Sequence, residues 1–372
     1  MFPNRFDRYL KENGATVENT LLSTQAPQLS LHDAQELAQE IYGIGARATS
    51  LTSERDQNFR LQASDGTSYV LKVSNPAEPR DVTGFQTLAQ RHLMQADAAL
   101  AVPQLIPALD GDDIHWLEDD GRMRAVRMMS FLPGVPLYKT ARSSGQRRQL
   151  GATLARFDLA LRGFSHPAAH HELLWDIQHA QRLRKLLVHI DDVARLRLAH
   201  AWMDNFETHV LPQLPSLRQQ VIHNDLNPFN VLVAEESGPG TEHITAILDF
   251  GDMVAAPLIN DLAIACSYQL SGGHDPLGAA AECVAAYHAV CPLTEQEVDI
   301  LFDLIATRLL ITVAITGWRA ALYPDNRAYI LRNNSLSWAG LEIFSGLPRM
   351  QAQQILRTAC GFQVKPWPEQ TS

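Results

Sequence analysis

The sequence predicts an α+β protein of two lobes, in which a small antiparallel sheet with packed helices precedes a mainly helical lobe. Three observations support this class. The chain has 372 residues, which is more than one hydrophobic core usually takes. Apolar residues recur with a period of two in several stretches between residues 46 and 132, as in half-buried strands. Beyond residue 146 the spacing is mostly helical, so the strands and the helices segregate along the chain.

The expected organisation is a polar arm at 1–29, an N-lobe at 30–132 and a C-lobe at 133–372. In the N-lobe, Ser30 caps a helix that Gly43 ends. "RATSLTS", "NFRLQAS" and "SYVLKVS" follow as strands, then the helix "DVTGFQTLAQRHLMQAD" and the hairpin "HWLEDDGRMRAVRMMSFL". The prolines and glycine of "SFLPGVPL" then stop regular structure and mark the boundary between the lobes.

The C-lobe is expected to be helical except for one β island, "NVLVAEESGPGTEHITAILDF", which contains two strands around a Gly/Pro loop. The predicted helices cover residues 146–164, 171–187, 190–211, 258–271, 276–290, 295–323 and 326–346.

Composition narrows the class of protein. Hydrophobic residues make up 46% of the chain and charged residues 19%, as in ordinary globular proteins. The formal net charge of -10 argues against nucleic acid as a partner, because phosphate contacts need a basic surface. No apolar run reaches transmembrane length and the first residues lack a signal-peptide core, so we expect no membrane partner and a cytoplasmic location. The four cysteines form no C-x-x-C pair, which favours buried reduced thiols.

One polar loop carries most of the chemical information. In "VIHNDLNPFNVLV", at 221–233, His223, Asp225 and Asn230 have the spacing H-x-D-x-x-x-x-N between apolar, strand-like ends. Phosphoryl transfer needs a carboxylate to orient and deprotonate the attacking hydroxyl, and oxygen ligands to hold Mg²⁺ on the phosphates. The alternative interpretation is a polar turn between two strands.

Two further stretches favour the same chemistry. An apolar strand ends at Asp249 in "ILDFGDM", where a carboxylate and the amide oxygen of Asn230 would both suit a hard cation such as Mg²⁺. Lys72 lies in the apolar strand "YVLKVS", from which a kinase lysine reaches the nucleotide phosphates. A snorkelling edge lysine is the alternative for Lys72.

These motifs resemble those of the aminoglycoside phosphotransferase and choline kinase-like superfamily, which has a protein-kinase-like fold, over roughly residues 30–345. The resemblance implies Asp225 as catalytic base, Asn230 and Asp249 as metal ligands, and Lys72 as phosphate ligand. His223 and Asp261 would be structural supports, Asp261 as an N-cap or a loop brace. For the nucleotide, the resemblance implies contacts from the phosphate-covering turn and from the hinge "MMSFL"; the candidates are Ser53, Asn58, Met129 and Phe131.

The chain departs from that pattern at two places. No G-x-G-x-x-G loop precedes Lys72, and the turn expected at 53–58 replaces it. The helix that should offer a glutamate to Lys72 reads "DVTGFQTLAQ", so Asp81, Glu78 or no acid at all takes that role.

The acceptor is expected to be a small hydroxylated amine or amino acid, phosphorylated from ATP or GTP with Mg²⁺. The sequence of the C-lobe resembles that of hydroxylysine kinases, which favours hydroxylysine as the acceptor over homoserine, choline, ethanolamine and aminoglycosides. A zwitterionic acceptor needs both charges in its pocket. Asp176 and Asp252 are candidates for its ammonium groups, Trp175 adjoins them, and Arg308 or, second, Arg319 would bind the carboxylate. The rival from another class is a non-catalytic, nucleotide-binding pseudokinase.

Overall fold

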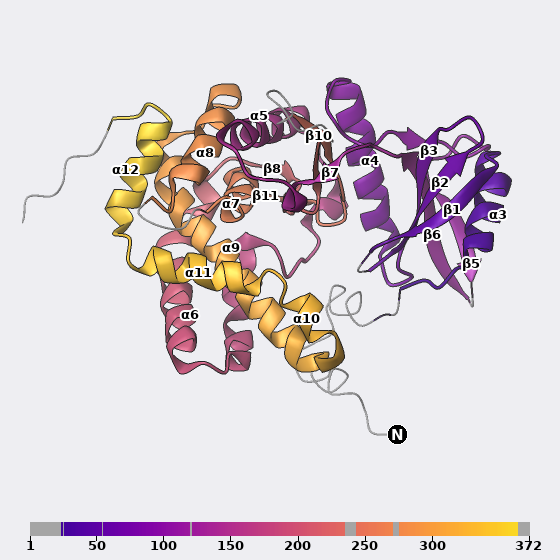
Figure 1. Ribbon diagram of the computed structural model, residues 1–372. Helices are drawn as coiled ribbons and strands as arrows, with labels where there is room; N and C mark the ends of the chain where they lie inside the picture. Colours follow the sequence, from indigo (N-terminus) through magenta and orange to yellow (C-terminus); the bar gives the residue numbers. More distant parts are fainter. Residues whose placement is uncertain are drawn as a thin grey trace, which may run out of the picture. The chain divides into compact units, whose positions relative to one another are not determined.

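The computed structural model describes residues 24, 26–53, 55–119, 121–234, 243–270 and 275–363 (Figure 1). The predicted polar arm at 1–29 lies almost wholly outside these residues. The chain divides into two compact units, which are described separately below. The N-terminal unit comprises residues 1–134, 164–172 and 245–251, and the C-terminal unit comprises residues 135–163, 173–244 and 252–372.

The N-terminal unit is built on an antiparallel sheet, as predicted. Strands β1, β2 and β3 form a meander, and β3 pairs with β6, which also pairs with β4 and β5. The strands are β1 (Ala46–Leu51), β2 (Gln57–Ala63), β3 (Ser68–Val73), β4 (Leu105–Ile106), β5 (His115–Asp119) and β6 (Arg122–Ser130). In the register of β2 and β3, Asn58 lies directly opposite Lys72. The strand β2 begins at Gln57, so the predicted turn at 53–58 ends earlier than expected.

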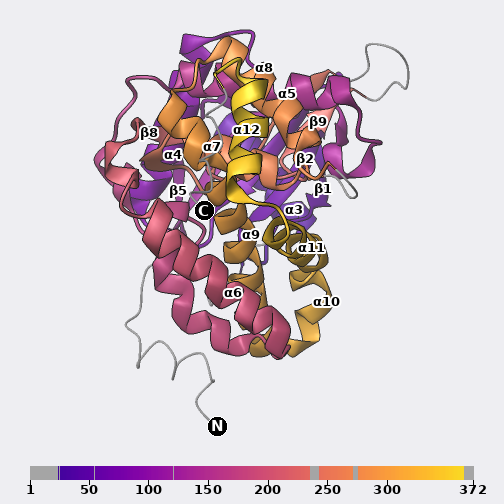
Figure 2. The ribbon, with the colours of Figure 1, turned by 90° about the vertical axis from the view of Figure 1, so that its left-hand side faces the viewer.

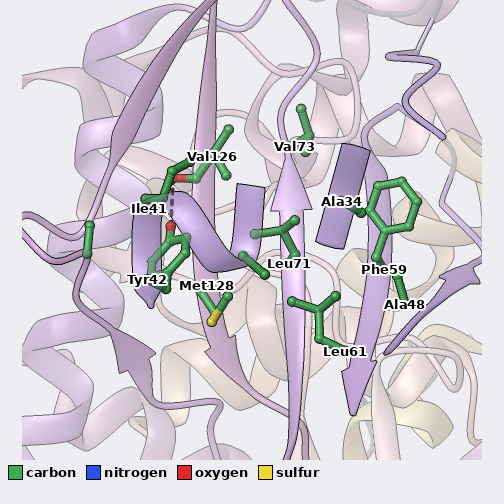
Figure 3. Packing of buried hydrophobic residues seen from close by; sticks show 12 residues of the cluster. Ala34, Ile41, Tyr42, Ala48, Phe59, Leu61, Leu71, Val73, Val126 and Met128 are labelled. Carbon is green, nitrogen blue, oxygen red and sulfur yellow. Dashed lines mark hydrogen bonds between the residues drawn. The ribbon is translucent and has the colours of Figure 1, made fainter. Parts of the chain in front are cut away.

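Helix α3 (Leu31–Tyr42) covers one face of this sheet. Ser30 and Asp33 form a capping box at its start, and Gly43 ends it with a left-handed backbone, φ 68°, as the sequence predicted. The apolar side chains of α3 pack onto alternate residues of the strands (Figure 3). The Tyr42 hydroxyl donates a hydrogen bond to the carbonyl of Val126 at 3.2 Å, which ties the helix to β6.

The opposite face of the sheet carries polar side chains. Because Leu71 and Val73 point into the core under α3, strand alternation turns Lys72 to the other face. Arg127 on β6 is only 3% exposed and donates to the Thr87 hydroxyl at 3.1 Å on helix α4 (Arg80–Ala96). The residues of α4 therefore help to enclose the face on which Lys72 lies.

The C-terminal unit is mainly helical, as predicted. The long helix α9 is its centre: α7, α11, α12 and the 3₁₀ helix η3 pack against it, and it runs between α6 and α11 in Figure 2. Its helices include α5 (Ser144–Ala160), η3 (Ile177–His189), α6 (Val193–Asn205), α7 (Ile259–Ser267), α8 (Gly278–Val290), α9 (Glu295–Leu322), α10 (Arg327–Ile330), α11 (Asn334–Ser345) and α12 (Arg349–Ala359).

The helical predictions need correction at three places. The helix expected at 171–187 begins only after Asp176, whose side chain caps it, has 3₁₀ geometry and is kinked at His179. The helix expected at 326–346 is broken by a turn into α10 and α11, and α12 was not predicted. Close packing also constrains α5, where a Cβ on Gly151 would lie 2.1 Å from the carbonyl oxygen of Cys283 on α8.

Short strands hold the polar loop at 223–230. Strand β8 (Gln219–Ile222), just before the loop, pairs with β11 (Val254–Pro257), and β9 (Val231–Val233), just after it, pairs with β7 (Val135–Pro136). The sequence predicted strands on both sides of the loop but neither β7 nor β11. The Gly/Pro loop predicted between β9 and β10 (Ile244–Ile247) falls outside the described residues for its whole central part.

All four cysteines are buried and take part in no disulfide, which confirms the prediction of buried reduced thiols. Over the part of the chain that the structure describes, no helix combines the length and apolar character needed to cross a membrane.

Candidate active site

The loop between β8 and β9 holds the carboxylate of Asp225 in a fixed orientation. Its Oδ2 accepts hydrogen bonds from the side-chain amides of Asn227 at 2.8 Å and Asn230 at 2.9 Å. The Asn230 amide also donates to the backbone carbonyl of Asp225 at 3.0 Å. Since the nitrogen of Asn230 points at Asp225, its amide oxygen is the atom that would bind a cation. Asn227 was not singled out from the sequence, although it lies within the motif.

Arg308 contacts the other oxygen of the same carboxylate. Its Nη2 lies 3.0 Å from Oδ1 of Asp225, and its Nη1 donates to the carbonyl of Trp175 at 3.0 Å. The guanidinium also lies over the Trp175 ring, 5.2 Å from the centroid, and the Arg308 side chain is 2% exposed. The sequence assigned Arg308 to an acceptor carboxylate. That role stays a prediction, and the geometry counts against it because two of the N–H groups already have partners.

Asp261, in the first turn of α7, braces the start of the loop. Its two carboxylate oxygens accept the backbone N–H groups of His223 and Asn224, each at 2.8 Å. Asn224 has a left-handed backbone, φ 63°, a conformation that asparagine tolerates better than most residues. The Asp225 N–H donates to Nδ1 of the buried His223 ring at 3.2 Å. Asp261 is not the cap of α7, so of its two expected positions the structure shows the loop brace.

A second buried acid lies behind this brace. The Asp158 carboxyl on α5 accepts the Tyr287 hydroxyl at 2.6 Å. Burial and the negative charge of Asp261 raise the pKa of Asp158 well above its ordinary value, so its neutral form is favoured. Burial also raises the pKa of Asp261, although His223 and the loop N–H groups oppose that rise. The loop is therefore anchored to a hydrogen-bonded polar cluster in the helical core of the unit.

In the N-terminal unit, Lys72 is paired with an acid that the sequence did not identify. Its Nζ lies 2.8 Å from Oδ2 of Asp56, which is in the turn before β2, and 3.9 Å from Oδ1 of Asp249. Burial by itself would favour the neutral amine, but the charges of Asp56 and Asp249 raise the pKa of Lys72 above its ordinary value. Lys72 is therefore held as a cation. The pairing of β2 with β3 places Asn58 opposite Lys72, and Asp56 lies two residues before Asn58, so the sheet register brings Asp56 close to Lys72.

The two acids suggested by the sequence are used differently. Glu78 accepts hydrogen bonds from the Thr83 hydroxyl at 2.8 Å and from the Gln86 amide at 3.1 Å. Asp81 is exposed in the first turn of α4, where a negative charge favours the helix dipole. The prediction that Glu78, Asp81 or no acid pairs with Lys72 was wrong, because the partner comes from the turn before β2 and not from the helix.

Asp249 presents its carboxylate from a strained turn. Its backbone is left-handed, φ 62°, which is uncommon for a residue other than glycine and costs about 1–3 kcal/mol. The carboxylate accepts the Gly251 N–H at 3.1 Å, and the Gln86 amide donates to the Gly251 carbonyl at 3.2 Å. The side chain of Asp249 is 52% exposed. An exposed carboxylate is a hard oxygen ligand of the kind that Mg²⁺ prefers, and the cationic lysine beside it suits the negative charge of nucleotide phosphates.

The predicted nucleotide contacts occupy the N-terminal unit. Ser53 is exposed after β1, and Asn58 lies on β2 with an amide oxygen that is buried and has no hydrogen-bond partner among the described residues. Met129 lies on β6, and the Phe131 N–H already donates to the Ser68 carbonyl at 3.1 Å. A contact from the Phe131 N–H to a base would have to replace that bond. The roles of all four residues stay predictions.

The remaining acceptor candidates lie in the C-terminal unit. Asp176 is fully buried, and its carboxylate accepts the backbone N–H of Gln178 at 3.0 Å. Burial raises the pKa of Asp176 to about 6, although hydrogen bonds from Gln178 oppose the rise. Asp252 is 8% exposed and its negative charge acts on Arg308. Arg319 lies three turns further along α9 than Arg308 and remains a prediction.

A metal site made only of protein side chains does not occur here: the described residues contain no cluster of three or more His, Cys, Asp and Glu side chains. The amide oxygen of Asn230 in the C-terminal unit and the carboxylate of Asp249 in the N-terminal unit are each hard donors of the kind that Mg²⁺ prefers.

An antiparallel sheet with an acid-paired lysine, followed by a helical unit with a braced H-x-D-x-x-x-x-N loop, defines a kinase-like phosphotransferase. The chain belongs to the phosphotransferase enzyme family, whose model matches residues 47–297. It is therefore a small-molecule kinase with an alcohol group as acceptor.

Individual relatives agree with this assignment. The chain is 28% identical over 355 residues to hydroxylysine kinase of Xenopus laevis, covering 90% of this chain and 94% of the relative. It is 27% identical to hydroxylysine kinase of Mus musculus, covering 88% and 93%. Among solved structures, an amicoumacin kinase matches with a TM-score of 0.64 and 16% identity, covering 86% and 95%. A microcompartment-associated aminopropanol kinase matches with a TM-score of 0.60 and 19% identity, covering 90% and 100%. The two structural likenesses show the kinase-like fold.

Proposed function

We propose that this kinase transfers the γ-phosphate of ATP or GTP to the hydroxyl of hydroxylysine in a Mg²⁺-dependent reaction. The observation that carries the proposal is the likeness to hydroxylysine kinases over about nine-tenths of the chain, together with an intact Asp225 loop. Homoserine, choline, ethanolamine and aminoglycosides remain the alternative acceptors.

Asp225 is the proposed catalytic base. Its carboxylate has Oδ1 against Arg308 and Oδ2 against Asn227 and Asn230, so neither oxygen rotates freely. Because Oδ2 accepts two of these hydrogen bonds and Oδ1 accepts one, Oδ1 is the oxygen that would take the proton of an acceptor hydroxyl as the phosphoryl group is transferred. Orienting the hydroxyl is the larger part of this role, because phosphoryl transfer depends mainly on positioning and charge.

Lys72, Asn230 and Asp249 are the proposed ligands of the phosphates and the metal. Lys72 is kept cationic by Asp56 and contributes positive charge toward the nucleotide phosphates. Asn230 offers its amide oxygen and Asp249 its exposed carboxylate as metal ligands. Bound Mg²⁺ would neutralise charge that develops on the transferred group.

A non-catalytic pseudokinase is not favoured. That alternative depended on a missing acid partner for Lys72, and Asp56 provides one at 2.8 Å.

An acceptor screen tests the proposal. Release of ADP or GDP is measured with hydroxylysine, homoserine, choline, ethanolamine and an aminoglycoside, with each nucleotide and with or without a chelator of divalent cations. We expect the highest turnover with hydroxylysine and none in the presence of the chelator. Nucleotide binding without turnover of any acceptor would instead support the pseudokinase, and preference for another acceptor would reject hydroxylysine.

A further inference from the structure

Arg308, the arginine that contacts the proposed catalytic aspartate, is buried and already has partners within the protein for two of its N–H groups. Arg308 is 2% exposed and directs Nη1 at the Trp175 carbonyl and Nη2 at Asp225. A bidentate contact to a carboxylate requires two parallel N–H groups that face the ligand. An amino-acid acceptor would therefore need another cation close to the loop.

Arg332, in the turn between α10 and α11, meets this requirement. Its side chain is exposed, and its guanidinium lies 5.0 Å from the ring centroid of Phe229, which is inside the catalytic loop between Asp225 and Asn230. The guanidinium also lies 3.9 Å from the ring centroid of Tyr329. Two aromatic neighbours reduce the freedom of the long side chain, so less entropy is lost when its N–H groups bind a ligand.

Phe229, the loop residue that contacts Arg332, is itself held in place by its neighbours. Phe229 packs against Tyr138, with ring centroids 4.4 Å apart, and the Tyr138 N–H donates to the carbonyl of Pro228 at 3.1 Å. Arg332 is therefore positioned against a supported part of the loop.

The charge of Arg332 also reaches the surroundings of Asp225. The buried phenol of Tyr268 senses several of these charges. Burial raises the pKa of Tyr268; Asp225 adds to the rise, and the charges of Arg308 and Arg332 oppose it. One phenol is thus within electrostatic reach of both arginines and of the catalytic carboxylate.

Arg332 has unused binding capacity. Its polar contact is a hydrogen bond from Nη1 to the Tyr329 carbonyl at 3.3 Å, and within the described part of the chain no carboxylate lies at ion-pair distance from it. An exposed guanidinium beside the proposed catalytic loop, with no acid partner among the described residues, is well suited to an anionic group of the substrate.

We propose that Arg332 binds the carboxylate of an amino-acid acceptor and so makes the kinase prefer amino acids over simple amino alcohols. This inference rests on the proposed function, because it requires an acceptor that carries a carboxylate. Arg308 then serves as a positioning residue for Asp225, and Arg332 determines specificity.

The test compares two acceptors that differ only in the carboxylate: hydroxylysine and its decarboxylated counterpart, 1,5-diaminopentan-2-ol. KM and kcat are measured for each with the wild type, Arg332→Ala and Arg332→Lys. Losing a charged hydrogen-bond pair should raise the KM for hydroxylysine on the order of 10- to 100-fold in Arg332→Ala, with kcat nearly unchanged. Arg332→Lys should recover part of the loss, because it keeps the charge but not the planar pair of N–H groups.

Arg327→Ala is the matched control, since it removes an exposed arginine from the adjacent helix α10 and should leave both KM values unchanged. An unchanged KM for hydroxylysine in Arg332→Ala, or an equal loss with both acceptors, overturns the carboxylate role while the proposed function stands. If the wild type phosphorylates the diamino alcohol as well as hydroxylysine, carboxylate recognition is likewise rejected. If the wild type does not phosphorylate hydroxylysine, both proposals fail together.

Discussion

Each unit positions one charged residue of the proposed active site, but the charges are reversed between the two units. In the N-terminal unit the working residue is a cation, Lys72, and the carboxylates of Asp56 and Asp249 position it. In the C-terminal unit it is a carboxylate, Asp225, and the buried cation Arg308 positions it from 83 residues away. Asp56 reaches Lys72 from the turn just before the neighbouring strand β2, whereas Asp225, which lies in a loop, is supported by distant helices. A side chain on a strand is oriented by the sheet register, but a side chain on a loop has no such local template.

Both units contain a residue other than glycine with a left-handed backbone at the proposed active site. Among the described residues, Asn224 and Asp249 are the two that are not glycine and have a positive φ, 63° and 62°. One lies beside the proposed base and the other is the proposed metal ligand. Such backbone persists only when its surroundings enforce it. Asp261 supplies the enforcement at Asn224, and the Gly251 contacts supply it at Asp249.

The largest effect is expected for Asp225→Asn, which removes the charged residue that Arg308 positions in the C-terminal unit. Asparagine keeps an oxygen for Arg308 but cannot take a proton, so turnover should fall by about 10²–10⁴-fold. Nucleotide affinity should stay nearly unchanged. Turnover is measured together with nucleotide binding and a thermal melt; Asp192→Asn, at the exposed cap of α6, is the control. Wild-type turnover in Asp225→Asn would show that the base is elsewhere.

A smaller effect is expected for Asp56→Asn, which removes the ion pair of Lys72 with Asp56 in the N-terminal unit. Without Asp56 the pKa of Lys72 should fall, because burial then acts against the weaker charges of Asp249 and Glu78 alone. The KM for the nucleotide should rise by about 10-fold, and the alkaline limb of the pH–rate profile should move to lower pH. Asp81→Asn, in the same unit, should change neither quantity. If Asp81→Asn and Asp56→Asn behave alike, the assignment of Asp56 is wrong.

The smallest effect is expected for Asp176→Asn. Burial raises the pKa of Asp176, whereas the pKa of Asp56, which is also buried, is lowered by the charge of Lys72. The pKa of Asp176 is about 6 in the folded protein, whereas the ordinary value for an aspartate is 3.8. The protonated carboxyl group therefore stabilises the fold at low pH, and this contribution is lost as the pH rises through about 6. Asp176→Asn should raise the free energy of unfolding by about 1–2 kcal/mol at about pH 8 and change it little at about pH 4. Denaturant melts at both pH values measure this difference. A loss of stability at the higher pH would mean that the carboxylate has an ionic partner.

Local pattern and motif were sufficient for much of the molecule. The period-two stretches predicted β1, β2 and β3, and Ser30 and Gly43 predicted both ends of α3, because such signals depend on residues a few positions apart. The spacing of His223, Asp225 and Asn230 likewise predicted the kinase class, since one loop contains all three residues. These features follow from the sequence alone.

The partners of the charged groups were decided by the tertiary structure. For Lys72 the sequence proposed Glu78, Asp81 or no acid, but the fold supplied Asp56. The contact of Arg308 with Asp225, which helix packing supplied, was not predicted either. Arg332 was not singled out, because nothing near it in sequence shows that its turn lies beside Phe229. Ion pairs depend on distances between residues far apart in the chain, and only the packed fold sets those distances.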